Sequence, residues 1–277
     1  MVWEYDDEAD AKESGDSRRA LVARITRLRA DLSETLARMD EIRQQVIPRI
    51  KADYATKIGV WNARRIKTEL AARRAKRRYA MARARVNRGE PVESEEITKA
   101  LDAEFADWKR LMDEKMRSLN ALLRWRSGRQ RMPAGNAEEL NRLFRRLARR
   151  FHPDLFPGDE ERAQYYEMAC NALADGDLDM LRALDVATAD WVDDVDYGRL
   201  TEDELAGEIE LLEDRLSSCR GDLNRMVSTE PYTLRAKLDD PEWVSGVVGG
   251  LRARVEAFER EKTHYDEAYD RLIKEDR

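Results

Sequence analysis

The sequence predicts an all-α protein in which long helical hairpins, interpreted as antiparallel coiled coils, flank a small helical domain. Charged residues make up 39% of the 277 positions, far above the roughly 25% of an average globular domain. With 13 Gly and 7 Pro, the chain holds fewer loop-forming residues than a compact α/β enzyme of this length needs. The hydrophobic fraction of 42% is nevertheless too high for a disordered chain. Long helices with one narrow buried stripe satisfy all three observations.

The N-terminal part of the chain combines an acidic segment with a long helix. Residues 1–16 are predicted to form a disordered acidic tail. Between Leu21 and Val46, apolar residues recur at intervals of three and four, which places them on one stripe of a helix. Pro48 lacks the amide donor and clashes with the preceding turn, so it is expected to end or kink this helix. A further helix is expected to span residues 50–88.

A Gly-Pro turn at 87–94 predicts that the next helix folds back on the previous one. Ser94 is a suitable residue for a helix start. Apolar residues from Ile97 to Leu123 continue the spacing of three and four. Two long helices joined by so short a turn are expected to form an antiparallel hairpin. This assigns residues 17–130 to an N-terminal coiled coil.

The C-terminal part repeats this arrangement after an acidic linker, residues 188–200. Thr201 and Glu204 form a capping-box pattern that indicates a helix start. Apolar residues then alternate at spacings of four and three in two stretches separated by a loop. Residues 201–277 are therefore predicted to form a second antiparallel hairpin. Either apolar seam could instead pair across a homodimer, and the sequence leaves both arrangements open.

Residues 137–187 are predicted to form the small helical domain. Its first helix is rich in arginine, and the apolar face of that helix holds Phe144, Leu147 and Phe151. Because proline disfavours helix at the residue before it, this helix must stop near His152 and present His152 and Asp154 on a loop. The next helix is expected to pack against the first. Its inward residues are predicted to be Tyr165, Met168, Ala169, Ala172 and Leu173.

The stretch LFRRLARRFHPDL, residues 143–155, resembles the second helix and HPD loop of the J-domain family, the DnaJ-like co-chaperones. The stretch ERAQYYEMACNALADGDLDMLRAL resembles a third helix with a short fourth. In that family the basic second helix docks on an acidic groove of seventy-kilodalton heat-shock ATPase chaperones, and the HPD loop couples docking to ATP hydrolysis. The resemblance implies docking through Arg145, Arg146, Arg149 and Arg150. It implies stimulation through His152, Pro153 and Asp154.

The chain departs from the family pattern at the first helix, at position 172 and at the fourth helix, where the Q-K-R motif is missing. The usual first helix, of the type D-Y-Y-x-x-L-G-V, is absent, because RSGRQRMPAGN occupies the preceding stretch. Either the end of the long helix near Leu119–Trp125 packs in its place, or the domain is incomplete. Ala172 stands where the family usually has an aromatic residue. The resemblance is confined to the central domain and leaves most of the chain without a family counterpart.

Residues 63–88 form a basic arm, with eleven Lys or Arg and a single acid, Glu69. A solvated helix face usually mixes both signs, so this bias requires an explanation. The arm could lie along a nucleic-acid backbone without reading sequence, since no aromatic residues are interleaved with its cations. It could meet an acidic protein, or fold against the acidic C-terminal half, where residues 175–214 hold fifteen acids and two arginines. The cations concerned are Arg64, Arg65, Arg73, Arg74, Lys76, Arg77, Arg78, Arg83 and Arg85.

The sequence contains no recognisable catalytic or metal-binding constellation. His152 and His264 are far apart, and the two cysteines, Cys170 and Cys219, are not clustered. Neither a zinc site nor a Cys/His nucleophile is therefore expected, and we predict no enzymatic activity and no cofactor. No run of about 18 uncharged apolar residues is present, and the N-terminus is acidic. The protein is thus expected to be soluble and cytoplasmic, without membrane contact.

These features together predict a co-chaperone or adaptor. The central module would recruit and stimulate a seventy-kilodalton heat-shock ATPase chaperone, while the coiled-coil arms would bind an unidentified client or complex. The alternative is a non-catalytic scaffold that binds nucleic acid or an acidic protein through the basic arm, with a J-like module that is only structural. Charge is divided unevenly, since residues 1–151 carry a net +12 and residues 152–277 a net −18. The sign therefore changes at the HPD motif, and both functions would use oppositely charged surfaces.

Overall fold

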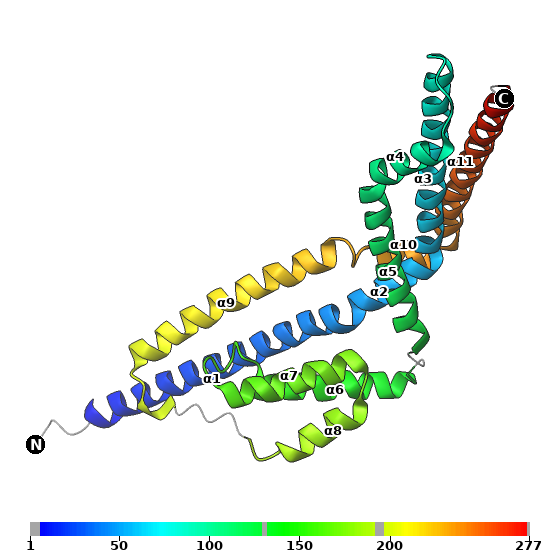
Figure 1. The fold of residues 1–277 in the computed structure, drawn as a ribbon. Helices are drawn as coiled ribbons and strands as arrows, with labels where there is room; N and C mark the ends of the chain where they lie inside the picture. The colour runs from blue at the N-terminus through cyan, green and yellow to red at the C-terminus, as the bar shows by residue number, and fades with distance from the viewer. Residues whose placement is uncertain (1–5, 129–131, 192–196, 276–277) are drawn as a thin grey trace, which may run out of the picture. The chain divides into compact units, whose positions relative to one another are not determined.

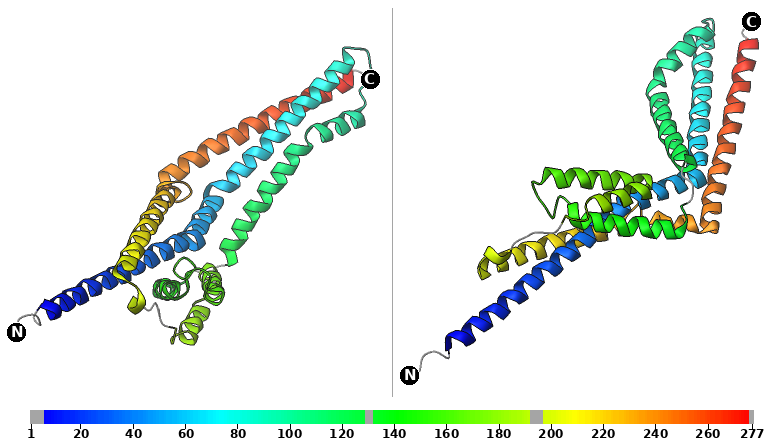
Figure 2. Two further views of the ribbon diagram at one scale, coloured as in Figure 1. Left: turned by 90° about the vertical axis from the view of Figure 1, so that its left-hand side faces the viewer. Right: turned by 90° about the horizontal axis from the view of Figure 1, so that it is seen from below.

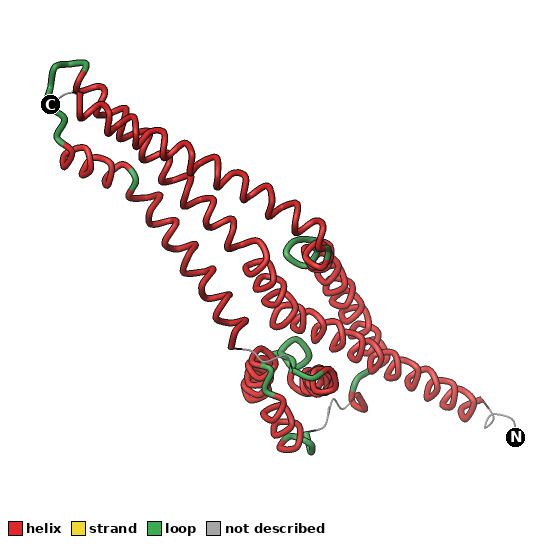
Figure 3. The backbone as a smooth tube through the Cα atoms, turned by 90° about the vertical axis from the view of Figure 1, so that its right-hand side faces the viewer, coloured by secondary structure: helices red, strands yellow, loops and turns green. Residues whose placement is uncertain are grey.

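The chain folds entirely into helices, turns and loops over the residues that the structure describes, as Figure 3 shows. The all-α class predicted from the sequence is therefore confirmed. None of the helices in this part of the chain is long and apolar enough to cross a lipid bilayer. The structure is a computed structural model, and it describes residues 6–128, 132–191 and 197–275.

Two compact units divide the chain, and each combines segments that are distant in sequence. Unit 1 consists of Met1–Pro48 and Gln130–Thr233. Unit 2 consists of Arg49–Arg129 and Leu234–Arg277. The predicted C-terminal hairpin, residues 201–277, is thus divided between the two units after Thr233.

Unit 1 is built around a long N-terminal helix, α1. A second long helix, α9, lies beside α1 (Figure 1), and the seam between them buries Ile25, Leu32, Leu205 and Leu212. Two ion pairs give their relative direction, because Arg24 meets Glu213 and Asp31 meets Arg220. The partner number rises along both helices, so they run parallel. The elements of unit 1 are α1 (Asp6–Glu41), η1 (Ile42–Val46), α6 (Ala134–Phe151), α7 (Glu160–Asp175), α8 (Leu178–Ala187), η3 (Tyr197–Arg199) and α9 (Glu202–Ser228).

Unit 2 is arranged around the basic helix α3, which lies between α5 and α11 (Figure 2). Helix α11 runs parallel to α3, because Arg64 pairs with Glu259 and Arg78 with Asp266. Gly89 takes the left-handed conformation, with φ of 69°, in the turn after α3, and α4 then returns antiparallel to α3. The elements of unit 2 are most of α2 (Ile47–Tyr54), η2 (Ala55–Gly59), α3 (Val60–Val86), α4 (Ser94–Glu104), α5 (Ala106–Gly128), α10 (Leu234–Asp239) and α11 (Pro241–Glu275).

The predicted C-terminal hairpin of residues 201–277 is wrong. Its two helices do not form one unit: α9 packs on α1, and α11 packs on α3. The packing is also parallel in both cases, whereas a hairpin would be antiparallel. A seam of apolar residues at spacings of three and four specifies that one face is buried, but it does not specify the helix that covers it.

The predicted disordered tail of residues 1–16 is wrong from Asp6 onward, where α1 begins. Residues 1–5 lie outside the described part of the chain. Acidic residues are favourable in the first turns of a helix because they interact with its positive end, and Ala, Glu and Lys are good helix formers. An acidic composition therefore does not prevent this segment from extending the helix that follows.

Pro48 does not end the helical path, because the helical conformation continues through α2. A π-helical turn, η1, comes immediately before α2. In a regular α-helix the ring of Pro48 would clash with the carbonyl of Gln44, four residues earlier, and Gln44 lies within η1. The helix therefore departs from regular α-helical hydrogen bonding in the turn that precedes the proline.

The predicted linker, residues 188–200, follows the last helix of the central domain. Helix α8 ends at Ala187, and the single-turn helix η3 lies just before α9. Residues 192–196 of this linker lie outside the described part of the chain. The predicted small domain of residues 137–187 corresponds to α6, α7 and α8, which pack on one another within unit 1.

Candidate partner-binding site

The HPD motif lies on a loop that joins two packed helices. Helix α6 ends at Phe151, and His152 caps it in an extended conformation, with φ of −60° and ψ of 128°, as Pro153 requires. Helix α7 begins after Asp159, whose side chain accepts a hydrogen bond of 3.0 Å from the backbone N–H of Arg162. Local sequence signals thus set both ends of the loop.

One apolar core holds the three helices of this domain together. The residues predicted for the inner face of α6 are fully buried, and Ala169 and Leu173 of α7 belong to the same core. Met168 does not, because 44% of its surface is exposed. Positions 169, 172 and 173 form the inward stripe of α7, and position 168 lies at its edge. The predicted helix packing is therefore present, with Met168 as the exception.

Helix α1 forms a further wall of this domain. Ala37 of α1 is fully buried in the same core, and α1 packs along α6. The sequence alternatives proposed that Leu119–Trp125 fills the place of the missing first helix, but these residues belong to α5 of unit 2. The small side chain of Ala37 lets α1 and α6 approach closely. In the sequence, Ala37 lies beside the leucines of the apolar stripe, so spacing alone does not show that it contacts a different helix.

His152 is fixed between α1 and α7, with only 8% of its surface exposed. Its Nδ1 accepts a hydrogen bond of 3.0 Å from the backbone N–H of Asp154. Its Nε2 lies 3.7 Å from a carboxylate oxygen of Asp40 in α1. Its ring meets the edge of Tyr166, with the ring centres 4.6 Å apart. Pro153 and Asp154 remain exposed to solvent, so the loop presents them and not the imidazole.

Asp40 is the centre of a small buried polar group. The hydroxyl of Tyr166 donates a hydrogen bond to its carboxylate, and Arg43 lies 3.2 Å away. Burial alone would raise the pKa of Asp40, but the contacts with His152 and Tyr166 outweigh it and lower that pKa below its ordinary value. Burial also raises the pKa of the nearby Cys170 thiol to about 11. A thiol protonated at neutral pH is a poor nucleophile.

Three of the four predicted docking arginines contact acids of the same chain. Arg145 binds Glu41 at 2.8 and 3.2 Å and lies 3.3 Å from Glu34. Arg146 and Arg150 both pair with Asp185 of α8, at 2.7 and 3.0 Å. Arg149 is exposed. The basic face predicted for docking is therefore partly engaged with α1 and α8.

Two acids of α1, Glu34 and Glu41, contact the predicted docking residue Arg145, and these contacts were not predicted from the sequence. Glu41 has 2% of its surface exposed, which is rare for a carboxylate unless it is paired. Glu34 and Glu41 are seven residues apart and hence lie on one face of the helix. The spacing of Glu34 and Glu41 is the sequence feature that could have indicated an acidic face on α1. The apolar residues of the same helix were interpreted instead.

The segment after the HPD motif is anchored to the seam between α1 and α9. Leu155 is buried in that seam. Arg29 of α1 donates a hydrogen bond of 3.4 Å to the carbonyl of Leu155, and its guanidinium lies 5.3 Å from the ring centre of Phe156. Arg215 of α9 approaches Asp154 at 4.0 Å. The loop thus touches both long helices of unit 1.

The basic arm forms α3, and acids of the same unit meet most of its cations. Their carboxylates come from α11, from α4 and from Glu69 within the arm. The predicted acid-rich segment, residues 175–214, belongs to unit 1 and supplies none of these pairs. Arg83 is exposed. The pairs are Arg64–Glu259, Arg65–Glu69, Arg73–Glu69, Arg74–Asp102, Lys76–Glu261, Arg77–Glu104, Arg78–Asp266 and Arg85–Glu96.

The described residues hold no group of three or more His, Cys, Asp or Glu side chains placed to bind a metal ion. Cys170 and Cys219 are both free thiols. Comparisons with protein-family models, with curated proteins and with solved structures find no match to this chain.

Proposed function

We propose that the chain is a J-domain co-chaperone or adaptor that recruits and stimulates a seventy-kilodalton heat-shock ATPase chaperone. The observation that carries the proposal is that α6 and α7 pack around one core and that the HPD loop joins them. In that arrangement Pro153 and Asp154 are exposed beside an arginine-rich helix. The long helices of the chain would bind a client or complex.

Electrostatics supports docking on an acidic partner. Arg149 is exposed, and the side chains of Arg145 and Arg146 remain at least 40% exposed despite their ion pairs. Exposed ion pairs are worth only about 0–1 kcal/mol, so an acidic groove on a partner can replace the exposed Glu34 beside Arg145 at little cost, whereas the pair with the buried Glu41 is expected to remain. Several cations on one short helix also raise the encounter rate and make it salt-sensitive.

Chaperone ATP turnover tests this proposal. We expect the full chain to accelerate turnover by the chaperone of its own organism, and Asp154→Asn to abolish the acceleration. Asp154 is exposed, so this change should leave the fold intact. Glu160→Gln is the matched control, since it removes one exposed carboxylate at the start of α7. Equal acceleration by the wild type and Asp154→Asn would overturn the proposal, as would no acceleration at all.

A second candidate is a coiled-coil scaffold in which the J-like module is a structural junction. The burial of His152 against Asp40 and Tyr166 favours it, because the chain's own side chains enclose the imidazole of the HPD motif and do not present it to a partner. On this alternative, His152→Gln lowers stability and the chaperone ATPase does not respond to the chain. Chaperone turnover with the wild-type chain separates the two candidates, because only the co-chaperone accelerates it. Thermal unfolding of His152→Gln then measures the structural contribution of the buried imidazole.

A further inference from the structure

Helices α5 and α11 flank the basic helix α3 of unit 2 (Figure 2). A groove lies beside α3, lined by side chains of α3, of α11 and of the segment that joins α4 to α5. Its volume is about 790 Å³. Cations of α3 and aromatic residues of the flanking segments line it, together with the carboxylates of Glu104 and Glu261. The lining side chains that matter are Arg73, Lys76, Arg77, Phe105, Trp108 and Phe258. We refer to these six residues as the aromatic-basic groove.

The fold supplies the aromatic residues that the basic arm itself lacks. Trp108 of α5 is 45% exposed, so part of its ring is open to solvent. The guanidinium of Arg73 lies 5.6 Å from the centre of its ring. Phe105 occupies the break between α4 and α5, and Phe258 comes from α11. Residues from three sequence segments thus place rings beside cations in one groove.

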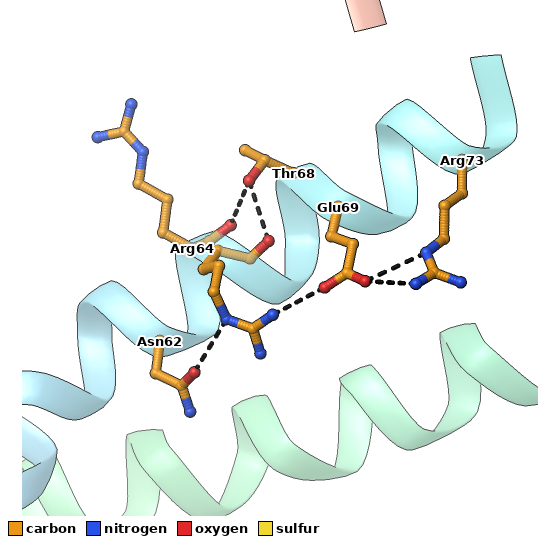
Figure 4. A network of polar contacts seen from close by, with 6 residues as sticks. Asn62, Arg64, Thr68, Glu69 and Arg73 are labelled. Atoms are coloured by element: carbon orange, nitrogen blue, oxygen red, sulfur yellow. Dashed lines mark hydrogen bonds and ion pairs between the residues drawn. The ribbon is translucent and has the colours of Figure 1, made fainter. Parts of the chain in front are cut away.

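The cations of the groove are available to an anion. The side chains of Arg73, Lys76 and Arg77 are each more than half exposed. Figure 4 shows that Glu69 fixes Arg73, accepting hydrogen bonds of 3.1 and 2.7 Å from it. Lys76 pairs with Glu261 at 3.9 Å, and Arg77 pairs with Glu104 at 2.9 Å. Both ion pairs are exposed to solvent and therefore weak.

We propose that the aromatic-basic groove binds single-stranded nucleic acid. A base would stack on the exposed ring of Trp108, while neighbouring phosphates would meet Arg73, Lys76 and Arg77 and displace Glu104 and Glu261. Single strands alternate flat rings with phosphates, and proteins that bind them without sequence preference combine a basic groove with aromatic platforms. An acidic peptide matches the cations but not the exposed indole. Unit 2 also holds 31 Lys or Arg against 22 Asp or Glu, which favours a polyanion.

Binding of a labelled twelve-nucleotide oligothymidylate to the full chain, followed by fluorescence anisotropy, tests the stacking contact. We expect Trp108→Ala to weaken binding about tenfold, as is typical for loss of one base–aromatic stack. Leu111→Ala is the matched control, because Leu111 lies one turn further along α5 and is 49% exposed. Its affinity should equal that of the wild type. Equal binding by Trp108→Ala and the wild type overturns the proposal.

Charge variants test the phosphate contacts with changes of opposite sign. We expect Lys76→Gln to weaken binding and to reduce the salt slope by about 0.7, the value for one phosphate of a single strand. Glu104→Gln and Glu261→Gln should strengthen binding, because each removes a competing carboxylate. Arg254→Gln, an exposed change on α11, should leave the slope near that of the wild type. If Lys76→Gln and Arg254→Gln change the salt slope equally, the proposed binding site is wrong.

The choice of competitor identifies the class of ligand. Polyglutamate and duplex DNA should both compete more weakly than unlabelled oligothymidylate at equal charge. Equal competition by polyglutamate would replace the proposal with an acidic protein partner, and equal competition by duplex DNA would exclude base stacking. The absence of binding at low salt would overturn the proposal outright. None of these outcomes depends on chaperone ATPase stimulation.

Discussion

Asp40 of α1 joins the HPD loop to the N-terminal helix through three different side chains. It accepts a hydrogen bond from Tyr166, lies 3.7 Å from His152 and pairs with Arg43. Its side chain is 14% exposed, so these contacts operate where solvent screening is weak. The lowered pKa of Asp40 means that its ionised form is favoured by folding. The carboxylate therefore stabilises unit 1 as long as it is charged.

We expect Asp40→Asn to lower the free energy of unfolding at pH 7 by about 1–3 kcal/mol, the range for a hydrogen-bonded charged group. Because the folded pKa lies below the unfolded value of about 3.9, this contribution is present above that value and is lost as pH falls through the folded pKa. Urea unfolding measured from pH 7 to pH 3 should show the two proteins converging below about pH 4. Asp179→Asn, at an exposed site, is the control. A difference between Asp40→Asn and wild type that is independent of pH would contradict the prediction.

Glu41 and Glu34 allow a matched comparison, since both contact Arg145. Glu41 is buried and also binds Arg38 at 2.9 Å, whereas Glu34 is exposed. Glu41→Gln should lower the free energy of unfolding by about 1–3 kcal/mol, because it leaves a buried site without its charge-assisted bonds. Glu34→Gln should cost less than about 1 kcal/mol. Chemical unfolding of both variants provides the measurement, and equal losses would show that burial does not decide the energy.

The individual helices are largely set by local signals. The predicted capping box is present at the start of α9, where Thr201 accepts from the backbone N–H of Glu204 at 3.2 Å and its own N–H donates to the Glu204 carboxylate at 2.7 Å. We expect Thr201→Ala to cost about 0.5–2 kcal/mol and to speed amide exchange in the first turn of α9. Ser217→Ala, an exposed change within the same helix, should leave that exchange unaltered. Unchanged exchange in Thr201→Ala would show that the cap does not hold the helix end.

Local signals also explain how much of the candidate site could be predicted. The end of α6 at the HPD motif and its inward face depend on Pro153 and on apolar spacing, which the sequence displays directly. The burial of His152 could not be predicted in this way, because it depends on Asp40, more than one hundred residues away in the sequence. The groove beside α3 was equally inaccessible, since Trp108 and Phe258 come from separate segments. Spacing identifies a face, but only tertiary packing selects what meets it.

At the scale of the whole chain, the two units carry net charges of opposite sign. Unit 1 holds 20 Lys or Arg against 35 Asp or Glu, and unit 2 holds 31 against 22. The asymmetry seen between the two halves of the sequence is thus retained, but the boundary is different. Helix α11 brings acids to the basic arm and places that arm's cations in ion pairs. A strongly basic stretch can therefore be neutralised by a distant helix while its unit stays net positive.

Removal of residues 201–277 tests this organisation directly. The deletion takes away α9 and α11, so the apolar seams of α1 and α3 lose their covers, including the contacts of Ile25, Leu28 and Leu32. We expect the shortened chain to lose cooperative thermal unfolding, to bind a hydrophobic dye and to aggregate, because exposed apolar stripes are association sites. Circular dichroism and dye fluorescence of the shortened and full-length chains provide the measurement. If the last 77 residues instead formed a separate hairpin, the shortened chain would unfold sharply and bind no more dye than the full chain.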